Sequence, residues 1–295
     1  MGLRRRVAQG RAGPCRRAAE THLGIWGKIL GGTAGLVLGG PIGALVGAVA
    51  GHAYDKSREF TDPRLEGGAD PFAGAETRRV AFATAVVVLG AKLAKADGVV
   101  TRAEIQAFRD TFGISDDEVG DVSALWDQAR ERADGFEPYA RQIAVLFGRS
   151  PELLEELLHG LFVIAAADGE INHDELRFLG QVAHIFGFDP TSFARLHALF
   201  EAAQRVGGPR VRFEGARGRA SRRPEPAVDP YAVLGLTGRA GDEEVRAAWK
   251  RLVREHHPDR LTAQGLPEEF VAQANRTLGA INAAYDQIAK QRGLR

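Results

Sequence analysis

Cysteine is almost absent from this sequence, because Cys15 is the only one among 295 residues. A single thiol excludes an internal disulfide and any metal site built from several cysteines, and it is typical of proteins in the reducing cytosol. Net charge is almost absent too, at +1 at pH 7. Hydrophobic residues make up 44% of the chain, so it can form two small domains with modest cores and a tail.

The small net charge results from segregated acidic and basic segments. Residues 1–22, a basic N-terminal extension, contain six Arg and one Glu, and residues 205–228 contain seven Arg and two Glu. Residues 80–204 contain ten basic and twenty acidic side chains. Surfaces of opposite charge therefore have separate roles. The segment 205–228 has too few apolar residues to pack, so we expect a basic flexible linker rather than a surface for nucleic acid or anionic lipid.

An apolar, glycine-rich segment covers residues 25–53. Between Lys28 and His52 it has 23 residues without an ionisable side chain, and roughly 20 are enough to cross a bilayer core. Residues four apart share one helix face, where glycine lets a second helix approach closely. The pattern predicts one transmembrane helix that self-associates, giving a homodimer in the lipid bilayer. The glycines recur at every fourth position: Gly27, Gly31, Gly35, Gly39, Gly43, Gly47 and Gly51.

Three other interpretations of this segment stay open: a disordered linker, a signal peptide ending near Ala48-Val49-Ala50, and a hairpin bent at Gly39-Gly40-Pro41. The orientation is also open, because the arginines of residues 1–22 would hold the N-terminus in the cytosol. Basic residues after the segment oppose this: Lys56, Arg58, Arg64, Arg78 and Arg79. A biological start near Leu23, with 1–22 as a mis-assigned extension, would remove the conflict.

The middle of the chain contains a repeat. After a linker at 54–79, the stretch "KADGVVTRAEI" at 95–105 matches "AADGEINHDEL" at 166–176, 71 residues later. Each copy follows an apolar run that predicts a helix, at 80–94 and at 152–166. Residues 80–204 are therefore predicted to form an all-α bundle of about seven helices.

Each copy of the repeat has the pattern of a helix–turn–helix joint. Gly98 and Gly169 suit the end of a helix, and an Asx or Thr followed by Glu three residues later suits the start of the next one. The alternative is a divalent cation held by carboxylate oxygens, although the spaced Asp/Asn ladder of an EF-hand is absent. The residues concerned are Asp97, Thr101 and Glu104 in the first copy, and Asp168, Asn172 and Glu175 in the second.

Residues 229–295 predict a short helix and then two long ones. "DPYAVLGL" opens the first, which Gly235 ends, and Asp242 is expected to cap the second, "DEEVRAAWKRLVREHH". Pro258 ends that helix. The second helix carries an apolar stripe of Val245, Ala248, Leu252 and His256, and a basic stripe of Arg246, Lys250, Arg251 and Arg254. The last helix, about 267–290, is expected to pack on the second through Phe270, Ala274, Leu278, Ile281, Tyr285 and Ile288.

The order of these features resembles the J domain of DnaJ-type co-chaperones over residues 229–292. The features are a Tyr-x-x-Leu-Gly opening, a basic helix, the triplet His257-Pro258-Asp259 (the HPD motif) and an Ala-Tyr pair near the end of the last helix. The resemblance implies that the HPD motif lies in the loop between the two long helices and engages a DnaK-type ATPase, while the basic stripe docks on its acidic face. Trp249, also expected among the partner-binding residues, stands where the family usually has Tyr. Trp keeps an aromatic contact but loses the phenol hydroxyl, which bears on the choice of partner.

The HPD motif is not expected to catalyse a reaction itself. Pro258 separates the His from the Asp, and the sequence offers no nucleophile beside them. We therefore expect a protein that is not an enzyme, that needs no cofactor, and that acts by biasing the conformational states of its partner.

The repeat resembles the TerB-like tellurite-resistance domains over about residues 80–204, and the order of all the segments resembles the DjlA family of membrane-anchored DnaJ-like proteins. This similarity implies a single-pass protein of the bacterial inner membrane with its TerB-like and J domains in the cytoplasm. There it would recruit a DnaK-type chaperone to membrane-proximal clients. The alternative is a membrane-tethered sensing or adaptor protein whose acidic TerB-like domain binds a metal or a regulatory partner, with Asp97, Glu104, Asp168 and Glu175 as candidates.

Overall fold

The computed structural model describes residues 40, 42–43, 75–96, 109, 112, 114, 119–131, 135–169, 171–206 and 228–294. Within these residues the secondary structure is helical and contains no strand, so the predicted all-α class is confirmed. Two groups of helices follow one another along the chain. We call 75–206 the central unit and 228–294 the C-terminal unit.

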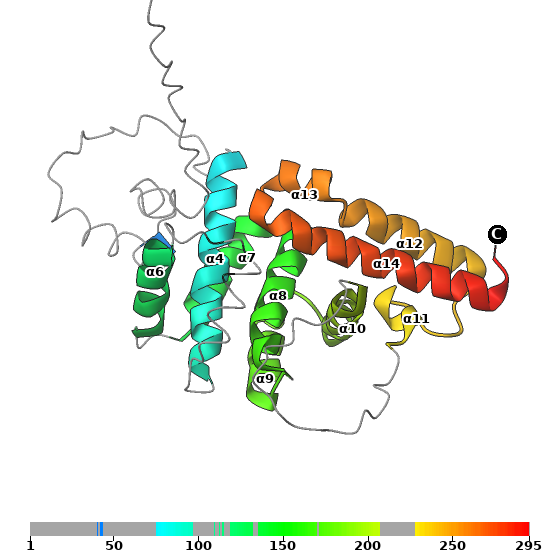
Figure 1. Ribbon diagram of the computed structural model, residues 1–295, viewed down its shortest axis with the longest axis horizontal. Helices are drawn as coiled ribbons and strands as arrows, with labels where there is room; N and C mark the ends of the chain where they lie inside the picture. Colours follow the sequence, from blue (N-terminus) through cyan, green and yellow to red (C-terminus); the bar gives the residue numbers. More distant parts are fainter. Residues whose placement is uncertain are drawn as a thin grey trace, which may run out of the picture.

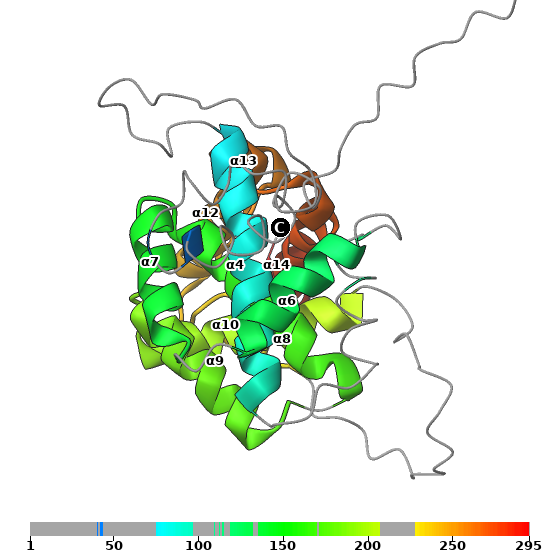
Figure 2. The same cartoon turned by 90° about the vertical axis from the view of Figure 1, so that its left-hand side faces the viewer.

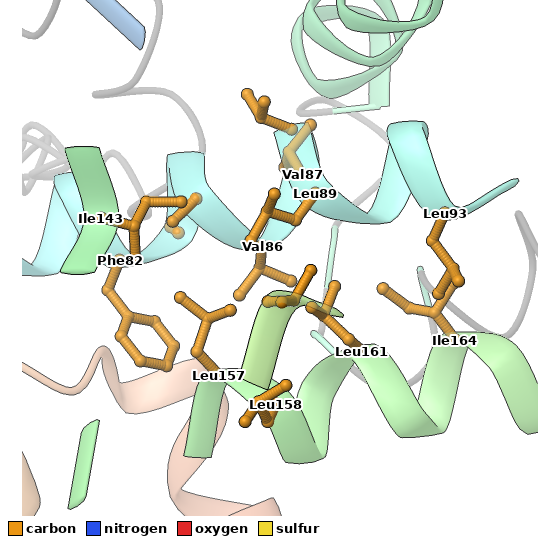
Figure 3. Packing of buried hydrophobic residues seen from close by; sticks show 14 of the residues in the cluster. Phe82, Val86, Val87, Leu89, Leu93, Ile143, Leu157, Leu158, Leu161 and Ile164 are labelled. Carbon is orange, nitrogen blue, oxygen red and sulfur yellow. The ribbon is translucent and has the colours of Figure 1, made fainter. Parts of the chain in front are cut away.

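The central unit is built around a long helix without a polar face. Helix α4 is buried along almost its whole length, from Val80 to Ala94, because a helix that is apolar all round is stable only inside a core. Its Phe82, Val86 and Leu93 meet side chains of α8, as Figure 3 shows. The helices are α4 (Ala75–Ala96), α6 (Val119–Glu131), α7 (Glu137–Phe147), α8 (Pro151–Ala165), α9 (His173–Ile185) and α10 (Pro190–Val206), with a 3-10 turn η1 (Ala166–Asp168).

A glycine allows three of these helices to come close together. A Cβ atom on Gly90 of α4 would lie 2.9 Å from Ile164 Cδ1 of α8 and 3.1 Å from Trp126 Cζ3 of α6. A side chain at this position would therefore force the side chains of Ile164 and Trp126 to shift. Figure 2 shows the resulting arrangement, with α4 running between α6 and α7.

The C-terminal unit is a helical hairpin. It comprises α11 (Pro230–Val233), α12 (Asp242–Glu255), α13 (Pro258–Gln264), a 3-10 turn η2 (Glu268–Phe270) and α14 (Val271–Arg292). Helices α12 and α14 lie side by side, with α13 at the end nearest α4 and α8 (Figure 1). The predicted apolar stripe of α12 is confirmed, since Val245, Ala248, Leu252 and His256 are all buried.

Two local predictions for this unit were wrong. The N-cap of α12 is Gly241, whose N–H donates to Glu244, while Asp242 pairs with Arg292 at 3.0 Å. The segment after His257 was expected to be a loop but forms α13, with Pro258 in its first turn. The same proline therefore ends one helix and begins the next, because its fixed φ and missing N–H suit a first helical position.

The two units share their cores. Leu261, Leu266, Phe270 and Ala274 of the C-terminal unit belong to the core of the central unit, and Leu199 and Ala203 of α10 belong to the core of the C-terminal unit. Phe270 and Ala274 were predicted to pack on the second helix of the hairpin, so this prediction was wrong for both. Helix α14 is buried on two sides, against α12 and against α10.

The predicted membrane segment lies mostly outside the described residues. Of its seven periodic glycines only Gly43 is described, and it is buried. The backbone N–H of Ile42 donates to Gln142 Oε1 of α7 at 2.9 Å. Among the helices that the structure describes, none is both long and apolar enough to cross a membrane. The segments 1–22, 54–74 and 207–227 also lie outside the described residues.

Candidate functional site

The HPD motif forms the start of α13 and presents its side chains to solvent. His257 is the N-cap of this helix, and its Nδ1 accepts the backbone N–H of Asp259 at 3.2 Å. The His257 side chain is 49% exposed and that of Asp259 is 94% exposed. Because Pro258 has a fixed φ, the direction of the backbone between the imidazole and the carboxylate is restricted.

The His257 and Asp259 side chains are not hydrogen-bonded to each other. Their nearest atoms, Nδ1 and Oδ2, are 3.9 Å apart, which exceeds a hydrogen-bond distance. The Nδ1 atom already accepts the backbone N–H of Asp259. The carboxylate therefore does not orient the imidazole as it would in a catalytic triad.

The basic stripe leads along α12 to the HPD motif. Lys250, Arg251 and Arg254 are exposed and Arg246 is half-buried. The opposite end of α12 carries Asp242, Glu243 and Glu244 in its first turn, so both ends of the helix have the charges that its dipole favours. The HPD motif and the basic stripe thus both lie on the surface of the C-terminal unit, with Arg254 three residues before His257.

Trp249 has a structural role in the hairpin. Its ring stacks on Tyr285 of α14 with centroids 4.3 Å apart, and its Nε1–H donates to Asn282 Oδ1 at 2.9 Å. The indole is half-buried between the two helices. Its effect on a partner would therefore pass through the position of α12 relative to α14.

Directly before the HPD motif, His256 is buried in a group of charged side chains from the central unit. Its Nδ1 lies 3.1 Å from Glu156 Oε1, and its Nε2 forms an ion pair at 3.2 Å with Glu155 Oε2, without the alignment of a hydrogen bond. Glu155 also pairs with Arg195 of α10 at 2.5 Å. On the other side of the HPD motif, Arg260 pairs with Glu152 at 2.7 Å. We call Glu152, Glu155, Glu156, Arg195, His256 and Arg260 the ionic cluster.

The ionic cluster keeps His256 charged. Burial by itself would lower the pKa of His256, but the carboxylates of Glu155 and Glu156 outweigh it and raise the pKa to about 9. Burial would likewise raise the pKa of Glu155, yet His256 and Arg195 bring it down to about 2. The pKa of nearby His159 is lowered, mainly by burial. At neutral pH the buried carboxylates therefore face two cations, His256 and Arg195.

Sequence reasoning placed His256 on a buried stripe but missed the ionic cluster. Its partners lie about 100 residues earlier in the chain, and no periodic pattern connects positions so far apart. One signal was present: Glu155 and Glu156 interrupt the apolar run of α8. A carboxylate in a buried helix requires a partner.

The candidate metal residues do not form a described site. Glu175 is buried, but its Oε2 accepts the N–H of Asn172, whose Oδ1 accepts the N–H groups of Asp174 and Glu175. The predicted capping box is therefore confirmed in the second copy of the repeat. Asp97, Glu104 and the side chain of Asp168 lie outside the described residues. In the part of the chain that the structure describes, no three His, Cys, Asp or Glu residues gather as a metal site would require.

Three family models match the chain, one after another. Residues 23–69 match the transmembrane domain of the co-chaperone DjlA, residues 83–198 match the tellurite resistance protein TerB, and residues 229–292 match the DnaJ domain. The DnaJ match contains the HPD motif and the basic stripe, and the transmembrane match contains the whole glycine-rich segment, 25–53. No solved structure matches the chain.

Curated relatives match almost the whole chain. The co-chaperone protein DjlA of Photobacterium profundum is 34% identical over 281 residues, which cover 92% of this chain and 100% of that protein. The protein of the same name from Shewanella oneidensis is 33% identical over 279 residues and covered to 99%, and that from Coxiella burnetii is 29% identical and covered to 98%. The similarity thus extends over all three matched segments in the same order.

Proposed function

Since the chain belongs to the DjlA family of co-chaperones, we propose that its HPD motif and basic stripe together stimulate ATP hydrolysis by a DnaK-type chaperone. The chain is a membrane-anchored co-chaperone that acts through its C-terminal J domain. The observation that carries the proposal is the exposed HPD motif, held at the start of α13 and continuous with the exposed cations of α12.

The geometry supports a mechanism in two parts. The cations of α12 attract an acidic surface of the chaperone and orient the encounter, since complementary charge chiefly raises association rates. The HPD motif then binds one conformational state of the ATPase better than another and shifts it toward hydrolysis. The 3.9 Å separation of His257 and Asp259 supports a role without catalysis by this chain itself, so the chaperone performs the chemistry.

The proposal extends to topology and assembly. The periodic glycines of residues 25–53 support a single span and a homodimer, and the lone cysteine supports a cytoplasmic position for the central and C-terminal units. In a bacterial inner membrane this arrangement would bring the chaperone to clients near the membrane. Protease treatment of spheroplasts and of inverted vesicles would test it, and cleavage of the C-terminal unit from the periplasmic side would contradict it.

Charge reversal on α12 is expected to weaken the action on the chaperone. We expect Lys250→Glu/Arg254→Glu to raise the half-maximal concentration for stimulation by about tenfold or more at low salt, because electrostatic steering contributes about 10- to 1,000-fold to association. The measurement is steady-state ATPase of a DnaK-type chaperone with the full chain in lipid nanodiscs. The difference should shrink at high salt, where exposed charges are screened.

A matched control makes the same change of charge elsewhere on the C-terminal unit. Arg239 and Lys290 are both exposed and lie outside the basic stripe, so Arg239→Glu/Lys290→Glu should leave the half-maximal concentration within about twofold of wild type. Equal losses in both double variants would contradict a specific docking role for α12, and no stimulation by the wild-type chain would contradict the proposed function.

A further inference from the structure

The C-terminal unit is fixed to the central unit at the end that carries the HPD motif. Phe270 lies between Phe82 and Phe112 of the central unit, with ring centroids 4.9 Å and 4.6 Å away. Leu261 and Leu266, on either side of the end of α13, are fully buried in the same core. The contact therefore has an apolar part, which lies at the end of the C-terminal unit that carries the HPD motif.

Polar groups of α14 complete the contact with α8. The Gln273 side chain donates to the backbone oxygen of Glu156 at 3.1 Å, and Thr277 Oγ1 lies 3.0 Å from His159 Nδ1. All four residues are buried. Buried polar groups lower the free energy of folding only when they find partners, so Gln273 and Thr277 favour this particular placement of α14 on α8.

Two members of the ionic cluster lie on either side of the HPD motif in the sequence. His256 precedes the motif and pairs with Glu155 and Glu156, while Arg260 follows it and pairs with Glu152. All three carboxylates lie on α8 and belong to the central unit. The motif itself lies between these two attachments, with His257 and Asp259 exposed.

We propose that the Glu152, Glu155 and Glu156 face of α8 is a docking site for the J domain, and that His256 and Arg260 are positioning residues that hold the HPD motif at a fixed place on the central unit. Docking leaves the motif and the exposed cations of α12 open to a partner. The docking contact does not depend on the proposed function, whereas its effect on the chaperone rests on that function. The central unit thereby sets where and in which orientation a chaperone binds relative to the membrane anchor.

The contact can be measured as a distance between spin labels in the full chain in lipid nanodiscs, without any chaperone. Gln181 on α9 and Gln287 on α14 are exposed, so both can be replaced by Cys for labelling in a Cys15→Ser background. The wild type is expected to give one narrow distance distribution by pulsed electron resonance. Glu152→Arg should broaden it several-fold, because the new Arg repels Arg260. The charge-swapped pair Glu152→Arg/Arg260→Glu should restore the narrow distribution.

The pH dependence provides a readout that a purely structural role would not give. Charged groups surround His256 and its partners on each packed element. Glu155 and Glu156 of α8 pair with His256, and His159 of the same helix lies near them. Three arginines pair with or lie near the carboxylates of α8: Arg195 of α10 with Glu155, Arg260 of α13 with Glu152, and Arg276 of α14 with Glu156. The pKa of His256 is raised from 6.5 to about 9, so its contribution to docking is complete below pH 6.5 and is lost as pH rises through about 9. The pKa of Glu155 is lowered from 4.5 to about 2, so its contribution is present above pH 4.5 and is lost as pH falls through about 2.

In the wild type the docked fraction should therefore fall between pH 6.5 and 9. In Glu155→Gln/Glu156→Gln the sign should reverse, because a buried imidazole without anionic partners disfavours its charged form. Docking of that variant should then improve as pH rises through the range in which His titrates. These substitutions lie on the central unit and leave the HPD motif and α12 unchanged.

The same variants link docking to stimulation of the chaperone. Glu155→Gln/Glu156→Gln is expected to raise the half-maximal concentration several-fold at pH 6.5 and to leave maximal stimulation unchanged, because the HPD motif is intact but less fixed. Two outcomes would overturn the docking site. One is a broad distance distribution for the wild type at pH 6. The other is a distribution that stays narrow in Glu152→Arg, together with an unchanged pH profile in Glu155→Gln/Glu156→Gln. Narrow distances with no stimulation would contradict only the proposed function.

Discussion

Replacing His257 by Gln is expected to lower stimulation of the chaperone's ATPase at least tenfold, while the chain stays folded and the C-terminal unit stays docked. The His257 ring is half exposed, and its contact within the chain is the acceptance of the Asp259 N–H by Nδ1. The Gln side chain also carries an acceptor, so the first turn of α13 can keep its cap. The variant lacks the imidazole that the wild type presents to the partner, so the expected effect is a loss of ATPase stimulation and not of folding. Steady-state ATPase of the chaperone with the full chain in lipid nanodiscs measures this.

His173→Gln provides the matched control. His173 is 90% exposed in the first turn of α9, far along the chain from the HPD motif, and its replacement should leave stimulation within about twofold of wild type, as expected for a surface site away from special contacts. Retained stimulation in His257→Gln would show that the exposed imidazole is not part of the working surface. An unfolded His257→Gln would instead appear as a loss of helical signal by circular dichroism.

Phe270→Ala is expected to lower the free energy of unfolding by about 3–5 kcal/mol, the usual cost of truncating a buried aromatic side chain. Phe270 is 1% exposed, and its ring contacts Phe82 and Phe112 of the central unit. Because these contacts join the two units, the loss should appear in both of them and not in the C-terminal unit alone. Chemical denaturation of the full chain, followed by tryptophan fluorescence, measures it.

Trp126 and Trp249 report on the central and C-terminal units respectively. The matched control is Val145→Ala on α7, since Val145 is 84% exposed and its truncation should change stability by less than about 0.5 kcal/mol. A Phe270→Ala variant whose central unit unfolds as in the wild type would show that the two units do not share one core.

The sequence was sufficient to predict most of the C-terminal hairpin. Its period of three and four placed Val245, Leu252 and His256 on the buried face of α12 and the cations on the exposed face, and the structure agrees. Helix α13 was missed because Pro258 was interpreted only as a helix stop, although the same residue suits a first helical turn. The capping box at Asn172 and Glu175 was predicted because both partners lie within one turn.

The attachment of the C-terminal unit to the central unit could not be predicted in this way. Phe270 and Ala274 fit the apolar pattern of α14, but a periodic pattern does not say which neighbour covers the face that it predicts. Gln273 and Thr277 are polar and do not belong to that apolar pattern, yet they are buried against α8. A helix that is buried on two sides, as α14 is, appears weakly amphipathic in the sequence. Pairings across more than 100 residues, such as Arg260 with Glu152, depend on the tertiary fold.

The most direct test of the account is hydrogen exchange of the full chain in lipid nanodiscs, with the ATP-bound and then the ADP-bound DnaK-type chaperone. We expect the ATP-bound chaperone to slow exchange over α12 and the first turn of α13, where the basic stripe and the HPD motif lie. We expect no new protection over α6 and α9 of the central unit. Protection confined to α6 or α9, or none over 245–260 with the ATP-bound chaperone, would contradict it.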